Sequence, residues 1–171
     1  MTQETLFTKR SHAPLAHLMR PTKIDDIVGQ EHLTGPDTIF ARKIEAKRVT
    51  SCLLYGPPGC GKTSLARAIA IVSGMTVVAL SAIDDGAAKI TKTVAEAKQR
   101  LAASGQQTLV FVDEIGEWTK TQQRNLLPCT EDGSIVLVGA TTANIGFSII
   151  SPLLSRLTTY ELKPHNRNSF H

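Results

Sequence analysis

The sequence predicts an α/β fold, in which helices cover both faces of a parallel five-stranded sheet. Short apolar runs alternate along the chain with longer segments whose apolar residues recur at the helical period. Glycine, proline and polar residues bound the apolar runs, as is typical of short buried strands. Such alternation is typical of βαβ units, whose ligands bind beyond the carboxyl ends of the strands.

The elements are expected to follow one another in alternation. Strands are expected at residues 51–55, 76–80, 108–112, 134–140 and 158–162. Helices are expected at 62–73, at 87–103 and from the capping box at Thr119 through Leu127, with Asp37 and Ser151 as N-caps of two shorter helices.

Composition and length indicate one soluble globular domain. The chain has 171 residues, of which 42% are hydrophobic and 20% charged, as suits a folded protein. We expect a flexible arm at 1–12, the folded core at 13–164 and a disordered tail at 165–171. No run of about eighteen apolar residues and no apolar signal segment occurs, so a cytoplasmic protein without membrane contact is expected.

The net charge and the cysteines give little information about the partners of the protein and about its compartment. The formal net charge of +4 and the pI near 9.1 suit a polyanionic partner but are too small to establish one. The three cysteines, Cys52, Cys60 and Cys129, are widely spaced and lack the spacing of metal ligands. A reducing compartment is therefore expected.

A phosphate-binding loop follows the first expected strand. Its residues fit the pattern G-x-x-x-x-G-K-[ST] and are Gly56, Pro57, Pro58, Gly59, Cys60, Gly61, Lys62 and Thr63, with Ser64 next in the helix. Glycines let backbone N–H groups turn toward phosphate oxygens, and the helix N-terminus adds the positive end of its dipole. Lys62 is expected to reach the β- and γ-phosphates of ATP, and the Thr63 hydroxyl to ligate Mg²⁺. The alternative is a fortuitous turn before a helix, which the strand–loop–helix context disfavours.

Two carboxylates end the third expected strand, where the apolar run 109–112 leads into Asp113 and Glu114. Asp113 is expected to hold Mg²⁺, directly or through water, and Glu114 to polarise the water that attacks ATP. The alternative is an acidic strand end that faces solvent. The adjacent pair favours an ATPase over a kinase, because a kinase does not need the second, water-activating carboxylate.

Motifs along most of the chain resemble the RarA/MgsA family of replication-associated recombination AAA+ ATPases, which is related to clamp loaders and to RuvB. These motifs are Met19-Arg20-Pro21, Val28-Gly29-Gln30-Glu31-His32-Leu33, Val112-Asp113-Glu114-Ile115, Leu126-Leu127-Pro128, Glu131-Asp132-Gly133, Gly139-Ala140-Thr141-Thr142 and Leu153-Leu154-Ser155-Arg156. The resemblance covers residues 14 to 164 and implies the P-loop NTPase fold of AAA+ proteins, with ATP and Mg²⁺ as cofactors.

The resemblance also implies roles for residues outside the phosphate loop. The residues that match the family's adenine-flanking segment are Arg20, Pro21, Ile27 and Val28. Thr142 matches the sensor 1 residue, which contacts the γ-phosphate or the attacking water. Arg156 matches the arginine finger, which reaches into the site of a neighbouring subunit. Taken without the resemblance, Thr142 would be interpreted as a hydroxyl at a strand end and Arg156 as a cation on the surface of a helix.

The implied function is the nucleotide-binding core of a DNA-dependent ATPase in replication-fork maintenance and recombination, associated with the nucleoid. Its implied partners are ATP or ADP, DNA at forks or single-strand gaps, and further copies of itself. Two alternatives stay open. One is a non-catalytic module that only binds ATP, and the other is a clamp-loader-like or RuvB-like subunit.

Two features depart from the family pattern. Gly116-Glu117-Trp118 replaces a His-Arg-Phe type of tripeptide, which is expected to weaken coupling to DNA. The sequence stops at His171, so the family's helical lid is expected to be absent and ATP hydrolysis by this chain weak.

Two further features each have two interpretations. The segment Gln3–Phe7 is similar to peptides that dock into the bacterial sliding clamp, although two apolar residues there also occur by chance. Cys60 is either a thiol activated by the helix N-terminus or, as favoured, a small residue that fills a tight loop.

Overall fold

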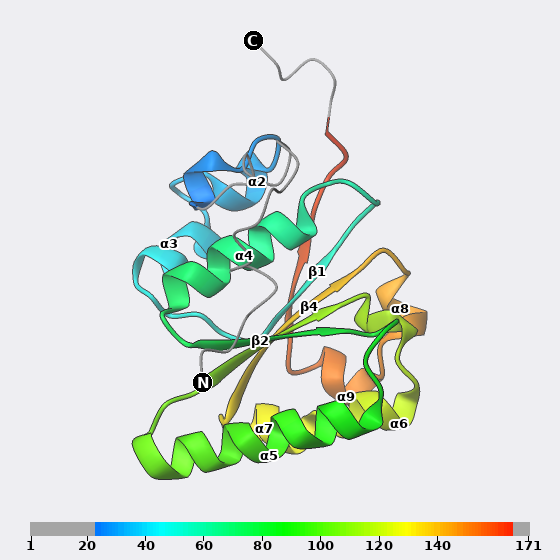
Figure 1. Ribbon diagram of the computed structural model, residues 1–171. Helices are drawn as coiled ribbons and strands as arrows, with labels where there is room; N and C mark the ends of the chain where they lie inside the picture. Colours follow the sequence, from blue (N-terminus) through cyan, green and yellow to red (C-terminus); the bar gives the residue numbers. More distant parts are fainter. Residues whose placement is uncertain (1–22, 166–171) are drawn as a thin grey trace, which may run out of the picture.

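A computed structural model describes residues 23–165 and shows the expected α/β fold (Figure 1). Its five strands pair in parallel in the order β2-β3-β4-β1-β5. The strands are β1 (Cys52–Tyr55), β2 (Thr76–Ser81), β3 (Thr108–Asp113), β4 (Ile135–Thr141) and β5 (Thr158–Glu161). All five lie within one residue of the expected bounds.

Helices connect the strands and precede the first one. The α-helices are α2 (Glu31–Thr34), α3 (Ile39–Glu45), α4 (Lys62–Ser73), α5 (Ala87–Ser104), α6 (Lys120–Arg124), α7 (Leu127–Glu131), α8 (Ile145–Ser148) and α9 (Ser151–Leu154). Two 3₁₀ turns, η1 (Ile24–Asp26) and η2 (Ile115–Glu117), complete the described part of the chain.

The helices cover both faces of the sheet. On one face, η1, α3 and α4 pack over a cluster that includes Leu54 of β1. On the other, α5, α7 and α9 pack over a second cluster that includes its neighbour Leu53. Both leucines are fully buried. Because central strands are buried on both faces, their sequences read as continuous apolar runs instead of alternating ones.

Local sequence accounts for the ends of the long helices. Helices α4 and α5 each end at a glycine with a left-handed backbone, Gly74 (φ 63°) and Gly105 (φ 69°). A glycine adopts this conformation without the steric cost that a Cβ atom brings. The capping box at Thr119 is present, because its hydroxyl accepts a bond from the N–H of Gln122 at 3.2 Å.

Three expectations about the shorter helices are wrong in detail. The N-cap of α3 is Thr38 and not Asp37, since the Thr38 hydroxyl accepts an N–H bond of 3.1 Å from the first turn. The helix after Thr119 is interrupted between α6 and α7, because Pro128 has no N–H to continue the α-helical bonding. Helix α9 begins at Ser151 itself, so this residue does not precede the helix as a cap.

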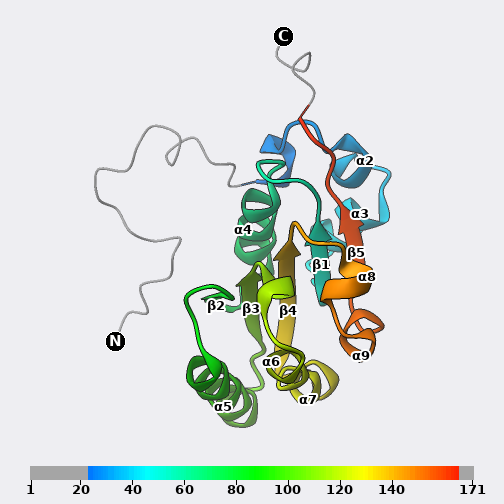
Figure 2. The ribbon, with the colours of Figure 1, turned by 90° about the vertical axis from the view of Figure 1, so that its right-hand side faces the viewer.

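The N-terminal elements and the end of β5 lie side by side near one end of α4 (Figures 1 and 2). At the other end of this layer, the ring of Phe40 in α3 meets Tyr160 of β5 edge-on, with centroids 4.9 Å apart. None of the helices between residues 23 and 165 combines the length and hydropathy needed to span a bilayer. Arg20, Pro21 and the segment Gln3–Phe7 lie outside the described residues.

Candidate nucleotide site

The carboxyl ends of three neighbouring strands bring most of the expected site residues together. The phosphate loop follows β1, Asp113 ends β3, and Thr142 follows β4. Strand β4 lies between β1 and β3, and its last residue, Thr141, is paired with Tyr55 at the start of the loop. This edge of the sheet is therefore where a ligand of the loop would meet the polar strand ends.

Glycines give the phosphate loop its conformation. Gly59 and Gly61 have left-handed backbones, with φ of 74° and 99°. A Cβ atom on Gly59 would meet nothing within 4 Å, so the loop is open there. A Cβ atom on Gly56 would lie 2.4 Å from the carbonyl oxygen of Leu162. Gly56 is thus required by the close approach of the chain that leaves β5.

The ammonium group of Lys62 lies inside the loop. Its Nζ donates to the carbonyl oxygens of Gly56 and Pro57 at 2.8 Å each and lies 3.6 Å from the Sγ of Cys60. Lys62 is only 7% exposed and Cys60 1% exposed, so the Cys60 side chain fills the inside of the loop. A bound phosphate would give the ammonium a charged acceptor, which forms a stronger hydrogen bond than a neutral carbonyl.

Two acidic side chains stand at the end of β3. Burial, and next the neighbouring charge of Glu114, raise the pKa of Asp113 above its ordinary value, while Lys62 opposes this shift. Glu114 has a left-handed backbone with φ of 51°, which is uncommon for a residue other than glycine. Its Oε2 accepts hydrogen bonds from the backbone N–H and the hydroxyl of Thr142, each at 3.2 Å. The structure thus joins Glu114, which the strand-end pattern assigned to water activation, to Thr142, which the resemblance assigned to sensing.

The segment 116–118 has a packing role that the sequence did not indicate. A Cβ atom on Gly116 would lie 2.9 Å from the Thr141 hydroxyl and 3.1 Å from the side chain of Ser148. Only a glycine lets η2 approach the end of β4 and α8 this closely. Trp118 is 3% exposed and belongs to the core on the α5 side of the sheet.

Arg156 lies apart from the phosphate loop and has partners of its own. Its Nη1 donates to the carbonyl of Pro152 at 2.6 Å, and its Nη2 forms an ion pair with Glu131 at the end of α7. The side chains of Arg156 and Glu131 are 38% and 51% exposed. A partly exposed guanidinium with one carboxylate partner can exchange that partner for another anion at low cost.

The remaining expected residues lie at the start of α4 and in the segment that precedes α2. Thr63 and Ser64 are in the first turn of α4, half-buried. Ile27 is buried against the α4 layer, whereas Val28 is 49% exposed.

Sequence reasoning missed the structural role of Gln30, which is 0% exposed. Its Nε2 donates to the carbonyl oxygens of Cys60 at 3.1 Å and Lys163 at 2.7 Å. Its Oε1 accepts from the N–H of Lys163 at 2.9 Å. Gln30 therefore fastens the phosphate loop to the chain that leaves β5. Its partners are distant in sequence, so no local pattern could have revealed these bonds.

Comparison with known proteins agrees with this geometry. Residues 52–164 match the model of the ATPase family associated with various cellular activities (AAA). The chain belongs to this family. The AAA+ fold and the resemblance to RarA proteins that the sequence predicts are both confirmed.

Individual relatives make the resemblance more specific. The chain is 41% identical over 157 residues to replication-associated recombination protein A of Escherichia coli, covering 92% of this chain and 35% of that protein. It is 42% identical over 159 residues to ATPase WRNIP1 of Dictyostelium discoideum, covering 93% of this chain and 18% of that protein. A RuvB mutant from Thermotoga maritima has a TM-score of 0.72 and 26% identity, covering 89% of this chain and 51% of that one. The chain therefore spans about a third or less of the length of these two curated relatives.

Proposed function

We propose that this chain binds Mg²⁺-ATP and hydrolyses it, as the nucleotide-binding core of a RarA-like ATPase that acts on DNA. One observation carries the proposal: Lys62, Asp113 and the bonded pair Glu114 and Thr142 meet at one sheet edge beside a complete phosphate loop. Each of these groups has a distinct task in phosphoryl transfer to water.

The residues present fit ATP and Mg²⁺. The loop offers a buried ammonium, an open glycine at Gly59, and the N-terminus of the twelve-residue helix α4, whose first N–H groups have no acceptor within the helix. The Thr63 hydroxyl and the Asp113 carboxylate are the hard oxygen ligands that Mg²⁺ prefers. A divalent cation would also offset the burial and the like charge that raise the pKa of Asp113. When bound, Mg²⁺ neutralises developing charge on the phosphate oxygens.

The pair Glu114 and Thr142 supports hydrolysis as well as binding. Thr142 donates two hydrogen bonds to one oxygen of the Glu114 carboxylate. In the proposed reaction that bonding fixes the orientation of Glu114, and its carboxylate takes a proton from the attacking water. A residue that served only to bind nucleotide would not need this arrangement.

Arg156 acts, in this proposal, on a nucleotide held by a second copy of the chain. Its side chain points to Glu131 and Pro152 in its own subunit and is partly exposed. The charge of a guanidinium at a neighbour's γ-phosphate stabilises the transition state. The proposal therefore includes self-association, in which Arg156 exchanges Glu131 for the nucleotide.

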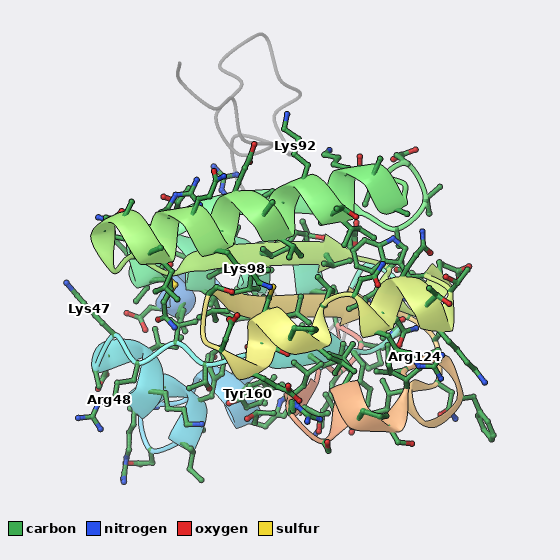
Figure 3. The ribbon with its side chains drawn as sticks, turned by 90° about the horizontal axis from the view of Figure 1, so that it is seen from below. Lys47, Arg48, Lys92, Lys98, Arg124 and Tyr160 are labelled. Atoms are coloured by element: carbon green, nitrogen blue, oxygen red, sulfur yellow. The ribbon has the colours of Figure 1, made fainter. Side chains whose placement is uncertain are left out.

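The DNA role rests on the names of the relatives, which describe replication-associated recombination proteins. The basic side chains on the described surface do not gather on one face, so they add no support for a DNA-binding surface. Figure 3 shows the basic side chains of Lys47, Arg48, Lys92 and Arg124 pointing outward in different directions. DNA contact is therefore assigned to the assembled protein and not to one face of this chain.

Steady-state phosphate release tests the proposal. The parent chain is expected to hydrolyse ATP slowly, and DNA is expected to accelerate this hydrolysis little, because DNA contact is assigned to the assembled protein. Glu114→Gln keeps the shape of the side chain but cannot take a proton, so turnover should fall by about 10²–10⁴-fold. ATP binding without hydrolysis in every sample would instead favour the non-catalytic module. Equal turnover by parent and variant would remove Glu114 from the mechanism.

A further inference from the structure

The chain that leaves β5 returns to the phosphate loop and is held there. Both backbone hydrogen-bonding groups of Lys163 are bonded to the buried amide of Gln30, whose Nε2 also bonds the carbonyl of Cys60 in the loop. In Figures 1 and 2 this segment rises past α2 beside the upper end of α4. The position of residues 163–165 is thus tied to the loop itself.

The imidazole of His165 lies near two glycines, one inside the phosphate loop and one in the turn before Gln30. A Cβ atom on Gly29 would lie 2.9 Å from its Nδ1, and a Cβ atom on Gly61 would lie 3.9 Å from its Nε2. Gly61 is the residue directly before α4. Gly29 lies in the turn that directly precedes Gln30. His165 is nevertheless exposed, so its ring borders a space that is open to solvent.

The two flanks of the loop are chemically different. One flank is the sheet edge with Asp113, Glu114 and Thr142, where charged and polar groups suit the terminal phosphate and its metal. The other flank holds the imidazole of His165 and the exposed, apolar side chain of Val28. A ring and an apolar side chain suit the nucleoside, which is attached to the opposite end of the phosphate chain.

We infer that His165 is a nucleotide-binding residue, whose imidazole contacts the ribose and base of the bound nucleotide. The inference rests on the proposed function, because it requires the phosphates to occupy the loop. An imidazole offers a flat face for stacking on a purine and ring nitrogens that bond a ribose hydroxyl. Gln30 is the positioning residue, since it fixes the backbone two residues before His165.

Calorimetric titration of the 171-residue chain with Mg²⁺-ADP and, separately, with Mg²⁺-pyrophosphate tests the inference. Pyrophosphate has the phosphate groups but no nucleoside. His165→Ala is expected to weaken ADP binding by about tenfold, as the loss of one good polar or stacking contact does, and to leave pyrophosphate binding unchanged. Lys62→Ala is expected to weaken both ligands. Phe147→Ala, which removes an aromatic ring that is 90% exposed on α8, serves as the control and should bind ADP like the parent.

Each alternative outcome has a distinct meaning. If His165→Ala binds ADP as tightly as the parent, the inference is overturned. Tighter binding by the variant would also overturn it, because the imidazole would then obstruct the site. Equal losses for ADP and pyrophosphate, or an equal loss in Phe147→Ala, would also overturn it. A parent chain that binds neither ligand would contradict the proposed function itself.

A second variant tests the positioning role of Gln30. Gln30→Met is similar in size but cannot form the three hydrogen bonds. Melting curves that follow the single tryptophan set a temperature at which every variant is folded. Gln30→Met also loses the bond to Cys60 in the loop, so pyrophosphate binding is expected to fall as well. The additional loss that ADP shows over pyrophosphate should not add to that of His165→Ala in the double variant, because this part acts through His165. Additive losses would show that Gln30 does not act through His165.

Discussion

The carboxylate of Glu114 accepts two hydrogen bonds from Thr142, one from its N–H and one from its hydroxyl, each 3.2 Å long. Glu114 follows β3 and Thr142 follows β4, so these bonds join the loops of two neighbouring strands. Glu114 also has a left-handed backbone, which costs energy in a residue with a Cβ atom. Such strain persists only where the surrounding structure holds it, as catalytic residues often require.

Thr142→Val tests the hydroxyl half of this relationship. Valine has nearly the same shape and keeps the backbone N–H bond to Glu114, but it loses the hydroxyl bond. A hydrogen bond to a charged group contributes about 1.5–3 kcal/mol, so ATP turnover should fall by about tenfold or more while ADP affinity stays unchanged. Turnover and binding measured in the same samples check this. A variant with the turnover of the parent would show that the hydroxyl does not help Glu114.

Gly116→Ala tests the close approach between η2 and β4. The added methyl group would lie 2.9 Å from the Thr141 hydroxyl and 3.1 Å from Ser148, so a loss of about 1–3 kcal/mol in the free energy of unfolding is expected. The control is Gly86→Ala, whose methyl group would meet nothing within 4 Å. Chemical denaturation of both variants decides the matter, and equal stabilities would contradict the packing described for Gly116.

Arg156→Ala should separate stability from activity. The ion pair with Glu131 is partly exposed, so its loss should change the unfolding free energy by no more than about 1 kcal/mol. If Arg156 acts on a neighbour's nucleotide, turnover should fall by about 10³–10⁵-fold. Mixing Arg156→Ala with Glu114→Gln should then restore part of the turnover, because one kind of mixed site has both groups intact. No recovery on mixing, or parental turnover by Arg156→Ala alone, would rule out action between subunits.

The thiols should be inert in the folded chain. Cys52, Cys60 and Cys129 are all buried. Burial raises the pKa of Cys52 to about 12 and also raises the pKa of Cys129. A thiol reagent at pH 8 should therefore modify none of them rapidly before unfolding and all three afterwards. Rapid modification of Cys60 in the native chain would revive the activated-thiol alternative for that residue.

Much of the fold could be predicted because the signals are local. The strands are short apolar runs bounded by turn residues, and the helix bounds at Gly74 and Gly105 follow from glycine at the C-terminus. The break in the helix after Thr119 is not visible in the hydrophobic spacing, because it depends on the missing N–H of Pro128. The phosphate loop could be found because its chemistry requires a fixed spacing of glycines and a lysine.

The rest of the candidate site depends on contacts between residues that are distant in the chain. Gln30 bonds Lys163, 133 residues away, and no sequence pattern marks that pair. The ion pair of Arg156 with Glu131 joins the turn after α9 to helix α7, and only the fold defines the relative position of these two segments. The position of His165 beside Gly61 likewise follows from the sheet, which places β5 next to β1.

Calorimetric titration of Mg²⁺-ATP into the parent chain and into Lys62→Ala tests the central claim most directly. The ammonium of Lys62 lies inside the loop and is the cation that the phosphates would meet. The parent is expected to bind one ATP per chain, and Lys62→Ala to bind it at least about 100-fold more weakly, because a charge-assisted bond to phosphate is lost. Lys92→Ala, which removes an ammonium 77% exposed on α5, should bind ATP like the parent. ATP affinity in Lys62→Ala equal to that of the parent would contradict the assignment of the site.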